Sequence, residues 1–222
     1  MSLSRGAHLC LATILGVSIA AGVSAQSSSS KHTKESSSTG TTAIDDGAVS
    51  NGVYRNKALG LAYKIPGGWV LRTEEMNSPD QAKDEEKPAT QGAQRNTGDQ
   101  HVLLAAFSRP PEARGEDVNS SILIAAESVG AYPGLKDAAQ YFGPLTEVAK
   151  AQGFAVDEEP YEYSVGAKKM VRGDFHKDVG TRVMRQSTLA FLSHGYAVSI
   201  TIIGGTDDEV EELIDGISFG GK

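Results

Sequence analysis

Three side chains able to bind a metal or transfer a proton stand two residues apart in the last third of the chain: Asp174, His176 and Asp178. Alternate residues of a β-strand share one face, so two carboxylates and an imidazole could converge on a divalent cation. A competing interpretation places Asp178 at the start of a turn, where Asp side chains bond to their own backbone. We therefore expect no metal site but a solvated, salt-linked hairpin, and these three residues are the candidate ligands if a metal binds.

Basic residues are concentrated in the same hairpin. Residues 168–185 contain six lysines and arginines against two aspartates, in a chain whose net charge is -7. A basic ribbon can bind an anionic partner, such as lipid head groups, acidic polysaccharide or an acidic protein face. Alternatively, these charges only solubilise an exposed strand and block edge-to-edge aggregation. The candidate partner-binding residues are Lys169, Arg172, Arg182 and Arg185.

Other catalytic patterns are missing from the sequence. It contains no G-x-S-x-G, Walker A, G-x-G-x-x-G or H-E-x-x-H motif. The acids at 157–159 precede Pro160 in an expected loop, where solvated carboxylates lack the raised pKa that a general acid needs. We expect a non-catalytic protein without a cofactor. The alternative is a metal-dependent hydrolase that uses the hairpin of Asp174 and His176.

The N-terminus has the pattern of a secretory signal peptide. Residues 9–23 are apolar, Arg5 precedes them, and small residues stand at 23 and 25. The run is short for a membrane span, so we expect cleavage after Ala25 and a secreted or periplasmic protein. Cleavage also removes Cys10, the only cysteine, which excludes thiol and disulfide chemistry. The alternative is an uncleaved anchor on an envelope assembly factor.

The remaining chain divides into a linker and one domain. Residues 26–50 contain 12 serines and threonines among 25 residues and no aromatic side chain, which predicts a disordered linker. Residues 51–222 form the domain. Its acidic net charge argues against nucleic-acid binding. Residues 74–100 are polar, and we expect them to be disordered apart from a short helix at 78–87.

The order of predicted elements indicates an α+β fold with an antiparallel sheet covered by helices. Strands are expected at 53–56, 59–66, 101–107 and 121–126, and a helix that Gly143 and Pro144 kink or split is expected at 133–152. A four-strand meander covers 162–165, 168–176, 181–192 and 196–203, with a three-residue turn at 178–180. Thr206 and Glu209 form a capping box that begins the last helix.

Residues at both ends of this domain resemble the PsbP-like family. They are Tyr54, Asn56, Gly60, Tyr63, Ile65, Pro66, Gly68 and Trp69, then Gly195, Tyr196, Val198, Ile200, Ser218 and Phe219. The resemblance covers roughly residues 53–219 and implies an α/β/α sandwich. The family includes a Ran-binding import factor and bacterial envelope proteins, and its members mostly bind partners. It has no shared catalytic motif, so the resemblance implies a binding domain and assigns no functional residue.

Overall fold

The computed structural model of the protein describes residues 44–78, 100–115 and 117–220. The expected signal peptide, most of the expected linker and all but Ser78 of the helix expected at 78–87 lie outside these residues. Within the described ranges, no helix is both long enough and apolar enough to cross a membrane.

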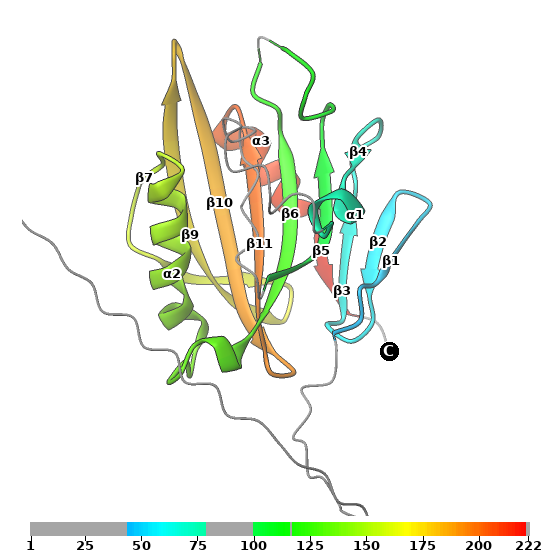
Figure 1. Ribbon diagram of the computed structural model, residues 1–222, viewed down its shortest axis with the longest axis vertical. Coiled ribbons are helices and arrows are strands. Elements are labelled where there is room, and N and C mark those ends of the chain that lie inside the picture. The colour runs from blue at the N-terminus through cyan, green and yellow to red at the C-terminus, as the bar shows by residue number, and fades with distance from the viewer. Residues whose placement is uncertain (1–43, 79–99, 116, 221–222) are drawn as a thin grey trace, which may run out of the picture. The chain divides into compact units, whose positions relative to one another are not determined.

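Two antiparallel sheets make up the described fold (Figure 1). The large sheet has the order β4 (Val70–Leu71), β5 (Gln100–Phe107), β6 (Ser121–Ser128), β11 (Tyr196–Gly204), β10 (Arg182–Ser193), β9 (Lys168–Val179) and β7 (Ala155–Val156), and β8 (Tyr161–Val165) also pairs with β9. The small sheet has the order β1 (Ala48–Ser50), β2 (Val53–Asn56), β3 (Leu61–Lys64) and β12 (Ile217–Phe219). The helical elements are α1 (Thr73–Met76), η2 (Val129–Ala131), α2 (Ala138–Ala151) and α3 (Asp207–Asp215). The α+β class is confirmed.

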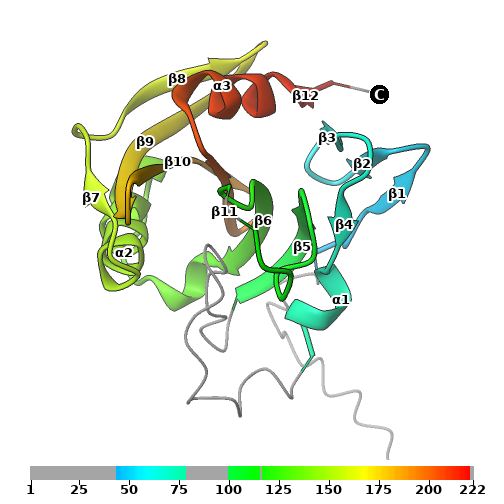
Figure 2. The ribbon, with the colours of Figure 1, turned by 90° about the horizontal axis from the view of Figure 1, so that it is seen from above.

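The main core lies between one face of the large sheet and the elements that cover it. Ile124, Leu189 and Ile200 of the large sheet pack with Tyr63 of β3 and Leu213 of α3. Helix α2 covers β9 and β10 on the opposite face, and Figure 2 shows α2 and α3 on either side of β10. Alternation along the strands explains both layers, because successive side chains point to opposite faces.

Helix α3 begins where its sequence signal predicts. The Thr206 side chain accepts a hydrogen bond from the backbone N–H of Glu209 at 3.1 Å. Acidic residues fill the first turn, where negative charge complements the helix dipole. One stripe of the helix, Val210, Leu213 and Ile214, is buried against the sheet. The Glu209 carboxylate accepts from the Gly205 N–H at 2.8 Å and not from the Thr206 N–H, so the reciprocal bond of the predicted capping box does not form. The Thr206 cap and the buried stripe therefore fix the start and the orientation of α3.

Removing the cap of α3 should be measurable. We expect Thr206→Ala to lower the free energy of unfolding by about 1 kcal/mol, because a backbone N–H loses its acceptor. Thr181→Ala, an exposed threonine in the β9–β10 turn, is the control and should change stability by less than about 0.5 kcal/mol. Urea denaturation of both variants provides the measurement. An equal effect of the two substitutions would contradict the capping role.

Three expected boundaries are wrong. Residues 48–50 are not linker, because β1 pairs with β2 in a regular ladder from Ala48↔Arg55 to Ser50↔Val53. The long helix begins only at Ala138, where the Asp137 side chain caps it by accepting from the Gln140 N–H at 2.9 Å. Asp178 does not begin a turn, because β9 continues to Val179, which pairs with Arg182.

Helix α2 is also continuous through Pro144, whereas the sequence predicted a kink or a split there. Proline clashes with the Cβ of the preceding residue when that residue is helical. Gly143 has no Cβ, so the residue expected to weaken the helix removes this clash. Phe142 and Leu145, on either side of the pair, are buried and hold the helix on the sheet.

Candidate functional site

Arg172 is the centre of a buried polar network on the α3 side of the large sheet. Its Nε donates to Asp174 Oδ1 at 2.9 Å, and its Nη2 donates to Ser187 Oγ at 3.0 Å and to Glu211 Oε1 at 2.5 Å. Arg172 and Asp174 share a face of β9, Ser187 is opposite Asp174 on β10, and Glu211 comes from α3. One guanidinium therefore connects two strands to a helix, although only 7% of the Arg172 residue is exposed.

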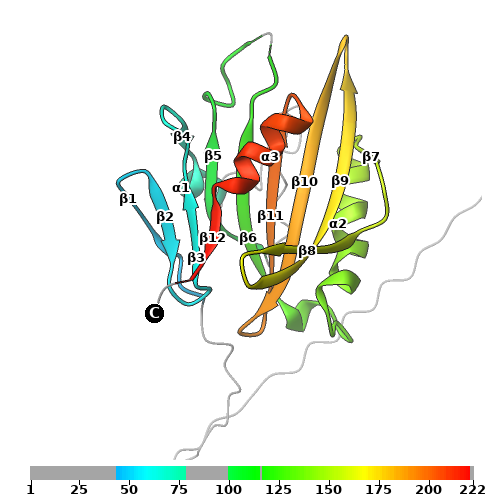
Figure 3. The ribbon, with the colours of Figure 1, turned by 180° about the vertical axis from the view of Figure 1, so that it is seen from behind.

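Both oxygens of the Asp174 carboxylate accept hydrogen bonds within the same network. Its Oδ1 also accepts from the Ser187 hydroxyl, and its Oδ2 accepts from the Tyr161 hydroxyl of β8 at 2.8 Å. Burial and the hydrogen bond to Asp174 raise the pKa of Tyr161 above its usual value. Burial alone would lower the pKa of Arg172, but the hydrogen bonds to Glu211 and Asp174 outweigh it and raise that pKa. Tyr161 of β8 and Glu211 of α3 both bond to this network, and Figure 3 shows β8 and α3 lying over the same face of the sheet.

His176 has a different set of partners. Its Nδ1 is hydrogen-bonded to Asp157, in the connection between β7 and β8. Arg185 lies opposite His176 on β10 and bridges two acids, with 3.8 Å from Nη1 to Asp157 Oδ2 and 3.3 Å from Nε to Asp207 Oδ1. The connection between β7 and β8 is therefore tied to the same strands as α3.

The three candidate metal ligands do not meet. Asp174 is bonded to Arg172, His176 is bonded to Asp157, and Asp178 lies exposed near the end of β9. The described residues contain no group of three or more His, Cys, Asp or Glu side chains placed to hold a metal ion. Strand alternation puts Asp174 and His176 on one face, as expected, but each is hydrogen-bonded to a different side chain.

The four candidate partner-binding residues have separate surroundings. Arg172 is buried, so its expected place on an exposed ribbon is wrong. Arg185 is engaged by acids from the β7–β8 connection and α3. Lys169 and Arg182 are exposed, and neither forms an ion pair within the described ranges. Among the hairpin's basic residues, Arg172 and Arg185 are thus paired with acids from other elements.

The acidic partners of Arg172 and Arg185 from other elements were not predicted from the sequence, because they lie far from the hairpin along the chain. The expected three-residue turn would have placed Arg182 opposite His176. Gly180, with φ of +64°, instead begins a two-residue turn, which places Arg185 there. Nothing local to the hairpin indicates Asp157, Glu211 or Tyr161 as partners.

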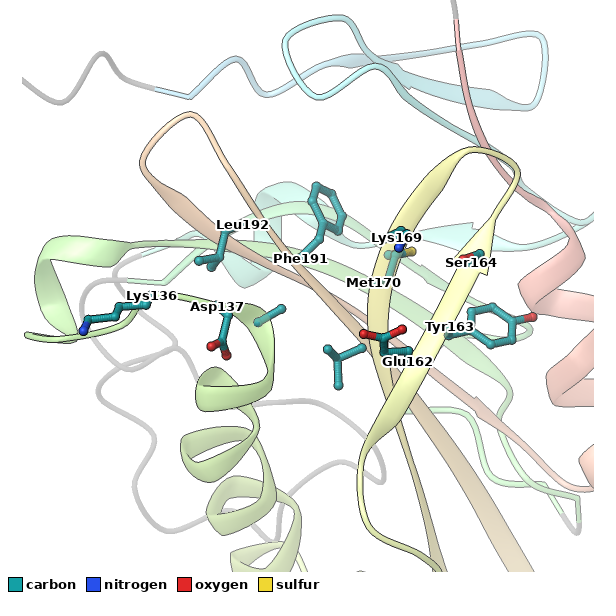
Figure 4. A pocket seen from close by; sticks show the side chains of 11 residues that line it. Lys136, Asp137, Glu162, Tyr163, Ser164, Lys169, Met170, Phe191 and Leu192 are labelled. Carbon is teal, nitrogen blue, oxygen red and sulfur yellow. The ribbon is translucent and has the colours of Figure 1, made fainter.

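A groove lies on the side of the β8–β9 hairpin that faces the start of α2 (Figure 4). The Arg172 network lies on the side that faces α3. The groove has a volume of about 270 Å³ and lies between the start of α2, β8, β9 and the end of β10. Val171 and Leu192 contribute apolar surface. Charge comes from Lys136, Asp137, Glu162 and Lys169. Small-molecule sites usually measure about 300–1,000 Å³, so the groove matches one small chemical group or one side chain of a partner.

Comparison with known proteins identifies no family. No family model matches the chain, and no curated protein matches its sequence. The PsbP-like assignment therefore stays a prediction.

Several solved structures resemble the fold at low scores. LpqN of Mycobacterium tuberculosis, a protein involved in cell envelope biogenesis, has a TM-score of 0.35 at 14% identity, with 72% of this chain and 83% of that chain covered. A protein of unknown function from Pseudomonas aeruginosa has a TM-score of 0.35 at 14% identity, with coverages of 50% and 80%. A protein from Bacteroides thetaiotaomicron has a TM-score of 0.36 at 9% identity, with coverages of 73% and 46%.

Proposed function

We propose that this protein is a secreted or envelope-facing binding domain without catalytic activity, built as a PsbP-like α/β/α sandwich. Its partner, a protein or an anionic ligand, binds at the groove between β8 and α2. No observation favours the alternative of a metal-dependent hydrolase, because Asp174 and His176 are bonded to different side chains. The alternative of an N-terminal anchor concerns residues outside the described ranges.

The observation that supports binding is the contrast between the two sides of the β8–β9 hairpin. On the α3 side, Arg172 and Arg185 are paired with acids. On the groove side, Lys136, Glu162 and Lys169 are exposed and form no ion pair within the described part of the chain. Charges beside an apolar surface are available to a partner, whereas paired charges mainly position the elements that carry them.

A charge reversal in the groove tests this function. We expect the double variant Lys136→Glu and Lys169→Glu to lose a partner that the wild-type full chain retains from an envelope extract. The control is Lys57→Glu and Lys64→Glu, which makes the same charge change at exposed positions around β3. Both variants should unfold at the wild-type temperature, because the four lysines are exposed.

A second measurement covers the anionic ligands. Thermal unfolding of the full chain is followed with heparin and with vesicles containing anionic lipid. A ligand at 100 times its Kd adds about 2.7 kcal/mol to the stability of the folded state. The groove variant should lose this rise and the control should keep it. Equal retention of every partner and ligand by the two double variants would reject the groove as the binding surface.

A further inference from the structure

Glu127 lies at the end of β6 (Figure 1), next to η2, and its buried carboxylate has no counter-ion among the described residues. Glu127 is 6% exposed. Its Oε1 accepts a hydrogen bond from Gln100 Nε2 at 3.1 Å, and its Oε2 accepts one from the Tyr132 hydroxyl. It forms no ion pair with any described residue. Burying a carboxylate is costly unless a cation pairs with it, so the site lacks one expected component.

The hydroxyl of Tyr141 is a second buried polar group at the same place. Tyr141 comes from α2 and is 1% exposed. Its hydroxyl makes no hydrogen bond of normal geometry with a described residue, although the side chains of Glu127 and Ser199 lie close enough to affect it. Burial raises the pKa of Tyr141, and the charge of Glu127 raises it further, which places the two groups near each other. Buried hydroxyls are almost always hydrogen-bonded, and the Tyr141 oxygen can accept a bond from a further donor.

The two tyrosines give the site aromatic walls. The rings of Tyr132 and Tyr141 meet edge to face, with centroids 5.3 Å apart and an angle of 75° between the planes. Aromatic rings attract cations through their negative faces. Gln100 and Tyr132 are only partly buried, so the site opens to solvent at this end of the sheet.

We propose that Glu127, Tyr132 and Tyr141 form a binding site for a primary ammonium group. An ammonium has three donors and no acceptor, so it can donate both to the Glu127 carboxylate and to the Tyr141 oxygen. A calcium ion needs six to eight oxygen ligands, whereas Glu127 supplies the one carboxylate of the cluster that it forms with Tyr132 and Tyr141. A guanidinium prefers two free oxygens of one carboxylate, whereas each Glu127 oxygen already accepts a bond. This site goes beyond the proposed function and shares no residue with the groove.

Titration with simple amines tests the proposal on the full chain. The probe is n-butylammonium chloride, followed by calorimetry and thermal unfolding, with sodium chloride at equal ionic strength and n-butanol as controls for salt and for the alkyl chain. We expect the amine alone to bind. Glu127→Gln, which keeps the shape of the side chain, should weaken this binding at least about tenfold, because the ammonium loses its charged acceptor.

Matched variants separate recognition from folding. Glu159→Gln makes the same charge change at an exposed position and should bind as the wild type does. Tyr141→Phe keeps the ring and removes the hydroxyl, so we expect a loss of about threefold to tenfold with unchanged unfolding. If Glu127→Gln does not fold, the Tyr141→Phe result decides. Binding of butylammonium that is no stronger than that of sodium, or equal binding by Tyr141→Phe and the wild type, would overturn the proposal.

Two further arms distinguish the sources of the ammonium group. Spermidine represents a free polyamine, and an acetylated, amidated Gly-Lys-Gly peptide represents the lysine of a protein partner. Tighter binding of spermidine than of the peptide identifies a small-molecule site, and the reverse identifies a contact for a partner's lysine. Either result supports the ammonium site, provided that the Tyr141→Phe variant loses the binding. Failure of both probes and of butylammonium would overturn it.

Discussion

Arg172→Met lowers the free energy of unfolding by about 3–5 kcal/mol, the loss expected when one partner of a buried ion pair is removed. Methionine keeps most of the side-chain volume, so the effect reports the missing guanidinium and not a cavity. Asp174, whose side chain is 18% exposed, loses its cation, and α3 loses its polar link through Glu211. Urea denaturation, with the slope compared between variants, measures the change.

The control for this experiment is Arg182→Met, which removes the same charge from the exposed end of the hairpin. It should change stability by less than about 0.5 kcal/mol. Adding Asp174→Asn and Glu211→Gln to Arg172→Met should recover part of the loss, because the unpaired charges are then gone as well. A loss below about 1 kcal/mol in Arg172→Met would contradict the structural role of the network.

Gly173→Val destabilises the protein by about 1–3 kcal/mol, the range observed when a packed core receives extra atoms. A Cβ at Gly173 would lie 2.5 Å from Cε1 and 3.0 Å from Cδ1 of Phe142, the aromatic residue by which α2 contacts β9. Valine favours strands, so local propensity predicts the opposite sign. Thermal and urea unfolding of the variant distinguish the two expectations.

Gly67→Val makes the same substitution where there is room. A Cβ at Gly67 meets nothing within 4 Å, and the turn is exposed. We expect a change within about 0.5 kcal/mol. Combining Gly173→Val with Phe142→Leu should cost less than the sum of the two single losses, because the smaller side chain relieves the clash. A Gly173→Val variant as stable as Gly67→Val would show that α2 does not pack on β9 in this way.

Local patterns predicted the elements of this fold well. Alternation in residues 196–203 predicted β11, and the capping box at Thr206 predicted the first turn of α3. These signals are read within a few residues, because side-chain periodicity and caps depend on the local backbone. The same reasoning failed at the β9–β10 turn, where moving the turn to Gly180 and Thr181 changed every cross-strand partner.

The candidate site was predictable only in part. Asp174 and His176 were expected on one face of a strand, and Lys169 was expected to be accessible, in agreement with the structure. Arg172 was expected to be accessible as well, and it is buried beneath α3. Nothing in residues 168–185 indicates this, because the acid that covers Arg172 is Glu211, 39 residues along the chain.

The sequence by itself determined where the longer strands and helices form, which residues of each strand share a face, and that antiparallel strands with helices make an α+β domain. Only the tertiary structure decided which charges are neutralised, and that Glu127 is buried with no ion pair to any residue that the structure describes. The physical reason is the distance along the chain over which each effect acts. Periodicity and capping act over a few neighbouring residues, whereas the environment of a charge depends on whatever distant segment the fold packs against it.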